Sequence, residues 1–260
     1  MISENRLRAL AREQEAGVGL MEKDYVNSWI LYAIFQSSFA DKLLFKGGTA
    51  LSKLYFPQRW RFSEDLDFTA TERIESLIPD LEHSLNETSD ISGIGFRIRD
   101  SHHNPDYTQL KIQYDAILQQ KNTTDLDLFQ DELVYFSSKK VTHSLEDLPE
   151  FNLGVYALEE IFVEKLRSLF QRARARDYYD LYWLIELKDF DKARIKQALE
   201  AKAEFKDLKV APSEFPGEQK IEDVRNYWDR ALDRFTNTKP DFDSVLEVIK
   251  AYMKQLWPQS

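Results

Sequence analysis

Apolar residues recur along the chain with two periods, and these periods predict its helices and strands. From about residue 3 to residue 40 the spacing is three and four residues, which predicts helix. A short apolar run over residues 43–45 then ends at Gly47-Gly48, which predicts a strand, a turn and a following helix. The apolar stripe of the first helical segment consists of Tyr25, Trp29, Tyr32 and Phe35.

The rest of the chain changes from a mixed pattern to a helical one. Polar and apolar residues alternate over 65–68 and 96–117, which predicts strands with a turn at 102–105. We also expect a helix over 71–85 and one or two strands within 126–141. From residue 158 the predicted helices span 158–172, 177–187, 191–204, 220–235 and 242–255. The pattern indicates an α+β fold, with a mixed-sheet domain at 1–150 and a helical domain at 151–260.

Composition narrows the class of protein. The chain has 35 basic and 45 acidic side chains and a formal net charge of -10, which excludes binding to nucleic acid through bulk positive charge but leaves a local basic groove open. It has no cysteine, which excludes disulfides, thiolate zinc sites and cysteine nucleophiles. No apolar run approaches the ~20 residues of a membrane span. We therefore expect a cytoplasmic globular protein.

The first candidate chemistry is an acidic pair, Asp65 and Asp67. Residues two apart in a strand project from the same face, so these carboxylates are expected to point together. Two neighbouring carboxylates repel unless a cation neutralises them. Hard oxygen ligands suit Mg²⁺ or Mn²⁺ bound together with substrate phosphates.

The glycine turn is the second part of the same pattern. Gly47-Gly48 lies between a predicted strand and a predicted helix, where backbone N–H groups favour an anion, and Thr49 adds a hydroxyl. Arg61 and Ser63 precede the acidic pair at alternate positions and are expected to reach a triphosphate. Each of these motifs alone is a weak sequence signal, whereas their combination indicates a phosphate–metal site. The alternative for an isolated acidic triplet is a solvated strand face, and Asp125-Leu126-Asp127 is a second such triplet.

A basic segment follows in the helical half. Residues 165–176 contain five basic residues and no acidic one, and Lys165, Arg172 and Arg176 fall near one line of an unbroken helix. This favours contact with a triphosphate or a nucleic-acid backbone. The alternative is a solvated face whose arginines pair with Asp177 and Asp180. On an unbroken helix Asp180 is placed to orient the Lys165 ammonium, with Asp177 as its rival.

Two blocks of sequence resemble the AbiEii/AbiGii-type, MenT-like toxins, which are polymerase-β-like nucleotidyltransferases. The blocks are residues 46–51 with 61–68, and residues 164–166 with Arg172 and 176–181; the resemblance spans roughly 20 to 187. It implies that Lys46, Gly47, Gly48 and Thr49 form the nucleotide-binding turn. It also implies that Asp65 and Asp67 hold the metal and that Lys165 is the family's lysine.

The resemblance also implies a function. It predicts a Mg²⁺-dependent transfer of an NMP from an NTP to an acceptor, with pyrophosphate released, by the toxin of a bacterial toxin–antitoxin or phage-defence system. The expected acceptor is the 3′ end of tRNA, and the expected partner is a cognate antitoxin. The alternatives are an NTP-binding regulatory module, a protein NMP-transferase on the same fold, and an interaction protein with a vestigial site.

A third carboxylate is expected to complete the site, since it helps bind the catalytic ion and deprotonate the attacking hydroxyl. Asp115 is the first candidate, because it shares a face of its predicted strand with Lys111 and Gln113. Asp127 is the alternative.

Overall fold

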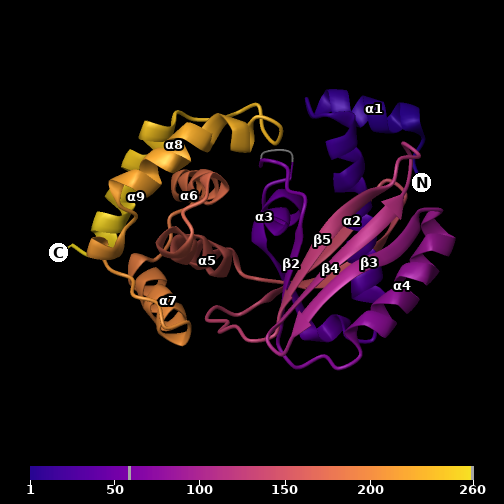
Figure 1. Cartoon of the computed structure of the whole chain (residues 1–260), viewed down its shortest axis with the longest axis horizontal. Helices are drawn as coiled ribbons and strands as arrows, with labels where there is room; N and C mark the ends of the chain where they lie inside the picture. The colour runs from indigo at the N-terminus through magenta and orange to yellow at the C-terminus, as the bar shows by residue number, and fades with distance from the viewer. Residues whose placement is uncertain (58–59, 259–260) are drawn as a thin grey trace. The chain divides into compact units, whose positions relative to one another are not determined.

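The computed structural model describes residues 1–57 and 60–258, and the chain forms two compact units (Figure 1). The first unit comprises Met1–Glu132 and Ser138–Tyr156. The second comprises Leu133–Ser137 and the chain from Ala157 onward. The main chain therefore passes from one unit to the other more than once.

A mixed sheet forms the centre of the first unit. Within the described residues its order is β3-β4-β5-β2-β1-β7-β6. The pairs β2–β5 and β1–β7 are parallel, and the other neighbours are antiparallel. The strands are β1 (Leu43–Lys46), β2 (Leu66–Ala70), β3 (Gly95–Asn104), β4 (Tyr107–Asp115), β5 (Asn122–Phe129), β6 (Lys139–Leu145) and β7 (Leu148–Val155).

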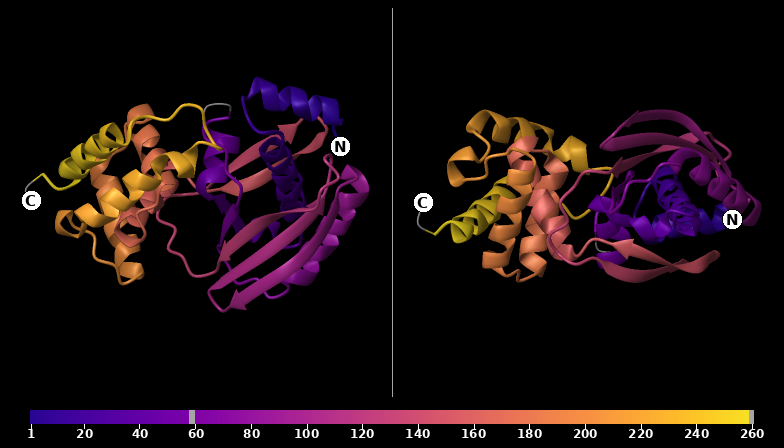
Figure 2. Two further views of the ribbon diagram at one scale, coloured as in Figure 1. Left: turned by 45° about the horizontal axis from the view of Figure 1, so that its top comes forward. Right: turned by 90° about the horizontal axis from the view of Figure 1, so that it is seen from below.

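Helix α2 supplies the core against which this sheet packs. The ring of Phe35 on α2 contacts the rings of Phe68 on β2 and Phe151 on β7, with centroid distances of 6.2 and 6.4 Å. Figure 2 shows the sheet bending around α2, and α4 packs against α2 and β3. The helical segments of this unit are α1 (Glu4–Glu13), α2 (Val18–Gln36), η1 (Ala40–Lys42), α3 (Gly47–Ala50), η2 (Leu51–Tyr55) and α4 (Leu77–Ser92).

The second unit is helical wherever it has regular structure in the described residues. Aromatic side chains build its core: Phe162 stacks on Phe190 at 4.4 Å, and Trp228 contacts Phe242 at 5.1 Å. Its helices are α5 (Leu158–Gln171), α6 (Ala175–Leu187), α7 (Lys192–Phe205), η3 (Pro212–Glu214), α8 (Glu218–Leu232) and α9 (Phe242–Leu256). The α+β expectation, with a helical part after a mixed sheet, is confirmed.

The structure differs from the sequence prediction in three places. The first helical stretch is two helices, because Glu15 takes a left-handed conformation with φ 50°. The helix expected over 71–85 lies at Leu77–Ser92. The domain boundary expected near residue 150 falls inside β7. This strand was not predicted, because Pro149 and Gly154 are residue types that weaken a strand pattern. A Cβ at position 154 would lie 2.7 Å from the Leu43 carbonyl oxygen, so the glycine permits the close approach of β1.

No helix in the described part of the chain combines the length and the apolar character needed to cross a membrane.

His143 on β6 is a buried titratable group in the first unit. Its Nε2 lies 3.3 Å from Ser28 Oγ on α2, and its ring contacts Phe151. Burial lowers the pKa of His143 to about 4; the charge of Lys53 lowers it further, and that of Asp24 opposes the shift.

Folding stability should therefore fall as the pH drops from 6.5 towards 4. In this window the unfolded chain protonates His143 and the folded chain does not, so the loss at pH 5 is about 2 kcal/mol. This loss of stability is measured as the difference between the free energies of unfolding in urea at pH 7.5 and pH 5. His143→Gln should flatten the pH dependence, and His83→Gln, at a ring that is 75% exposed, should leave it unchanged. An unaltered pH dependence in His143→Gln would contradict this prediction.

Candidate active site

The glycine turn begins where β1 ends. Gly47 has φ +77°, a left-handed conformation that L side chains adopt at a cost. The following helix is short, because the four residues of α3 continue into the π-helical turn η2 and end before Phe56. The strand–turn–helix order that the sequence predicts is present, with a much shorter helix than its pattern suggests.

The glycine turn and the acidic segment lie directly against each other. A Cβ at position 47 would lie 2.2 Å from Asp67 Oδ2, so this carboxylate occupies the space that a side chain would fill. A Cβ at position 48 would lie 2.8 Å from Arg61 Nη2 and 3.1 Å from Ser63 Oγ. Two motifs that are separate in sequence therefore pack against each other.

The sheet register gives Asp67 an acidic neighbour. Asp67 on β2 lies opposite Lys46 on β1 and opposite Asp127 on β5, and residues opposite each other share a face. Asp127 Oδ1 accepts hydrogen bonds from the Tyr107 hydroxyl at 2.5 Å and from Gln109 Nε2 at 3.0 Å. Burial first, then this hydrogen bond and the charges of Asp127 and Asp67, raise the pKa of Tyr107. The two carboxylates thus act on the same phenol.

Asp115, the first candidate for a third carboxylate, lies elsewhere. It stands at the end of β4, opposite Gly95, whereas Gln109 is the β4 residue opposite Asp127. The six positions from 109 to 115 span about 20 Å at ~3.3 Å per residue. The structure brings Asp127 beside Asp67 and does not bring Asp115 there. The alternation of polar and apolar residues predicted that Asp115 shares a strand face with Gln109, the residue opposite Asp127. It could not predict which position along β4 lies beside Asp67.

Thr49 forms a hydrogen bond to the backbone of the acidic segment. Its side chain is buried, and its hydroxyl donates to the Asp65 carbonyl oxygen at 2.5 Å. The structure thus shows this hydroxyl bound to the Asp65 backbone, and its expected contact with phosphate stays a prediction. Arg61 is buried as well, and its Nη1 donates to the Phe62 carbonyl oxygen at 3.0 Å.

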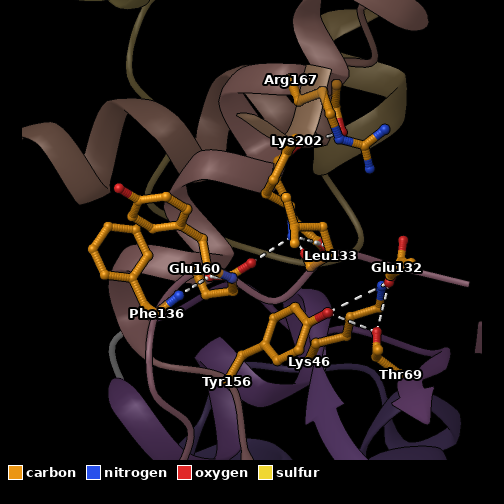
Figure 3. Close-up of polar contacts among 12 residues, drawn as sticks. Lys46, Thr69, Glu132, Leu133, Phe136, Tyr156, Glu160, Arg167 and Lys202 are labelled. Atoms are coloured by element: carbon orange, nitrogen blue, oxygen red, sulfur yellow. Dashed lines mark hydrogen bonds and ion pairs between the residues drawn. The ribbon is translucent and has the colours of Figure 1, made fainter. Parts of the chain in front are cut away.

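Lys46 is paired inside the first unit. Its side chain is only 5% exposed, and its ammonium forms an ion pair with Glu132 (Figure 3). The Lys46 Nζ also lies 4.4 Å from the centroid of the Phe129 ring. Glu132 Oε2 also accepts from Thr69 Oγ1 at 2.5 Å and from the Tyr156 hydroxyl at 3.4 Å. Glu132 was not among the predicted site residues, and its one signal in the sequence is its position just after an alternating strand.

Lys165 in the helical unit is held by both of its rival partners. Its Nζ lies 2.9 Å from Asp177 Oδ1 and 2.9 Å from Asp180 Oδ2. Arg172 Nε lies 3.1 Å from Asp177 Oδ2. Burial alone would raise the pKa of Asp177, but Lys165 and Arg172 lower it to about 2. Asp177 is therefore ionised and forms ion pairs with both Lys165 and Arg172.

The helical line predicted for the basic segment is interrupted. Helix α5 ends at Gln171 and α6 begins at Ala175, with Ala173 between them at φ 46°. Arg176 lies over the Phe235 ring, 4.3 Å from its centroid. The break allows Asp177 and Asp180 to face Lys165 together.

A second buried ion pair holds residues 133–137 within the helical unit. Lys202 pairs with Glu160, and its Nζ donates to the Leu133 carbonyl oxygen at 2.6 Å (Figure 3). Glu160 Oε2 accepts from the backbone N–H groups of Tyr135 and Phe136 at 3.0 and 2.7 Å. Both charges are buried and hydrogen-bonded, as such groups must be.

The residues around the turn fit a divalent cation in donor chemistry. Asp65 and Asp67 supply hard oxygen ligands, and the Gly47 cradle leaves the Asp67 carboxylate against a backbone without a side chain. In the part of the chain that the structure describes, no three His, Asp or Glu groups form a ready-made metal cluster. Oxygen atoms of a bound substrate would add further hard ligands of the same kind.

Comparison with solved structures identifies the class of fold. The whole chain aligns with MenT4, a nucleotidyltransferase toxin from Mycobacterium tuberculosis H37Rv, at a TM-score of 0.71 and 17% identity, covering 100% of this chain and 91% of that one. At this identity the likeness shows the fold, which is that of a nucleotidyltransferase toxin. No curated protein matches the sequence.

The family follows from the sequence itself. The family model "Nucleotidyl transferase AbiEii toxin, Type IV TA system" matches residues 29–248. The chain belongs to the AbiEii family of nucleotidyltransferase toxins, and the resemblance drawn from its motifs is confirmed. It is an enzyme of the nucleotidyltransferase class and the toxin of a type IV toxin–antitoxin system.

Gly47→Ala should abolish transfer, because a methyl group at this position meets Asp67 and because φ +77° strains an L residue. We expect a loss of at least about 100-fold in NMP transfer, typical of a misplaced reacting group. Label transfer from α-³²P NTPs measures it. Gly19→Ala, on α2 with nothing within 4 Å, is the matched control and should keep full activity. An active Gly47→Ala enzyme would show that the turn does not carry the site.

Lys165→Met should destabilise the helical unit by about 3–5 kcal/mol, because it removes the buried cation that lies 2.9 Å from both Asp177 and Asp180. Urea unfolding measures this loss. Lys250→Met, at an exposed lysine of α9, should change stability by less than about 0.5 kcal/mol. The double variant Lys165→Met/Asp177→Asn should recover part of the loss. If Lys165→Met is as stable as the wild type, the ion pairs do not stabilise this unit.

Proposed function

We propose that this toxin transfers an NMP from an NTP to the 3′ end of tRNA with the help of Mg²⁺ or Mn²⁺. The observation that carries the proposal is the Asp67 carboxylate lying in the space of the absent Gly47 side chain. This contact joins a metal-binding carboxylate to a backbone turn suited to phosphate.

The metal ligands in this proposal are Asp65 and Asp67, with Asp127 as the third carboxylate in preference to Asp115. Support for Asp127 comes from its position opposite Asp67 and from the two hydrogen bonds that orient it. When bound, the cation neutralises the carboxylates and the phosphate oxygens, so that negative groups can approach one another.

The triphosphate lies along the glycine turn in this proposal. We expect the N–H groups of Gly47 and Gly48 to face it, and Arg61 Nη2 and Ser63 Oγ lie beside Gly48. Lys46 holds the turn through Glu132 rather than contacting phosphate. Charge neutralisation by Lys165, Arg172 and Arg176, with Asp180 orienting Lys165, stays a prediction.

The reaction is a single displacement at the α-phosphorus. The acceptor hydroxyl oxygen forms the new P–O bond, the bond to pyrophosphate breaks, and the hydroxyl proton passes to a carboxylate of the set. Asp127 suits this last role, because Tyr107 and Gln109 occupy Oδ1 and orient the group.

An RNA acceptor requires local attraction, because the net charge of -10 opposes a polyanion at long range. The basic segment 165–176 supplies such a patch, with Arg172 48% exposed and Arg174 also exposed. Membership of a toxin–antitoxin family implies a cognate antitoxin as the other partner.

The proposed chemistry is tested by transfer of label from each α-³²P NTP into total RNA and total protein. Asp67→Asn and removal of divalent cations by EDTA should each reduce transfer by at least about 1,000-fold. Asp127→Asn should reduce it by at least about 100-fold, and Asp115→Asn should not. Asp125→Asn, at a 39% exposed carboxylate of the second acidic triplet, is the matched control. Label in protein alone would exclude tRNA, and an active Asp67→Asn enzyme would exclude the metal mechanism.

A further inference from the structure

The segment that leads into the acidic pair has no regular structure of its own. Residues 61–65 are neither helix nor strand, so their backbone groups need other partners. Two successive carbonyl oxygens obtain them from buried side chains: Asn27 Nδ2 donates to Glu64 at 3.0 Å, and Thr49 Oγ1 donates to Asp65 at 2.5 Å. The backbone just before β2 is thus held by hydrogen bonds from two different elements, α2 and α3.

Asn27 is connected at both ends of its amide. It lies on α2 with a fully buried side chain, and its Oδ1 accepts a hydrogen bond from Thr124 Oγ1 at 2.8 Å. The Glu64 carbonyl only accepts, which requires the amide nitrogen to face it and the oxygen to face Thr124. Thr124 is itself fully buried on β5, the strand that carries Asp127. One amide therefore ties the approach to Asp65 and Asp67 to the strand of their acidic neighbour.

A buried amide such as that of Asn27 costs free energy of folding unless it is hydrogen-bonded. The neighbouring buried positions of α2 are largely apolar, and burying an amide without partners costs several kcal/mol. Helix packing alone would be served by a leucine. The asparagine instead makes hydrogen bonds to two segments, which an apolar residue could not make.

We propose that Asn27 is a positioning residue for the metal-binding carboxylates, acting through the Glu64 carbonyl on one side and Thr124 on the other. It touches neither substrate nor cation. Its amide sets the backbone from which Asp65 and Asp67 project and couples that backbone to β5. The inference rests on the proposed function, because it takes these carboxylates as the metal ligands.

The test measures Mn²⁺ binding to the full-length protein without NTP, followed by the loss of the paramagnetic resonance signal of the free ion. Asn27→Asp replaces the donor by an oxygen facing the Glu64 carbonyl, and Thr124→Val removes the second bond with little change of volume. We expect Asn27→Asp to weaken Mn²⁺ binding by about 10–100-fold and Thr124→Val by about 10-fold, the range found when groups that orient metal ligands are removed. Thr124→Ser should restore wild-type binding.

Ser28→Ala is the matched control. Ser28 is the next residue of α2, is equally buried, and accepts a hydrogen bond from Lys53 Nζ at 2.9 Å, away from residues 61–65. It should lower the melting temperature and leave Mn²⁺ binding unchanged. If Asn27→Asp and Ser28→Ala lower the melting temperature alike and neither changes Mn²⁺ binding, the inference is overturned while the metal site stands. If the wild type binds no Mn²⁺, the proposed function fails and the inference with it.

Discussion

The contact between Gly47 and Asp67 is the constraint on which the rest of the first unit depends. The antiparallel register of β1 and β2 sets Lys46 opposite Asp67, and the chain then turns at a residue without a Cβ, so the backbone closes onto the carboxylate. Thr49 and Asn27 hold the backbone of the facing segment, and Glu132 holds the lysine that precedes the turn. Thr49 and Asn27 are fully buried and the Glu132 side chain is 6% exposed, so these contacts are shielded from water and hold the turn and the facing segment in one arrangement.

Buried lysines show how an acidic chain distributes its cations. Lys46, Lys165 and Lys202 are each almost fully buried, and each contacts carboxylates: Glu132, Asp177 with Asp180, and Glu160 respectively. Desolvating an ammonium costs more than a surface ion pair returns, so burial is tolerated only with such partners. These lysines organise a strand end, a helix break and a connecting segment. Lys46 directly precedes the glycine turn in sequence, and its ammonium forms an ion pair with Glu132 in the structure.

Elements with a strong local signal were predicted well. The helices of the second unit lie within a few residues of their predicted ranges, since the 3.6-residue period is sustained in each. The stripe of Tyr25, Trp29, Tyr32 and Phe35 does belong to the helix at the centre of the first unit. The strand β7 escaped prediction because Pro149 and Gly154 imitate a turn, although the glycine is there to admit β1. Glu132 and Asn27 escaped as well, because nothing nearby in sequence marks a polar residue whose partners are 86 and 37 positions away.

The sequence by itself determined the family, the α+β class and the two motifs of the candidate site, because these depend on residue types at short, regular spacings. Only the tertiary structure decided which residues meet. It placed Asp127 rather than Asp115 beside Asp67, turned the Thr49 hydroxyl to the Asp65 backbone, and gave Lys165 both of its rival carboxylates. The physical reason is the same in each case. Alternation and helical period tell which face a side chain occupies, whereas strand register, helix breaks and the pairing of buried polar groups follow from hydrogen bonds between segments distant in the chain.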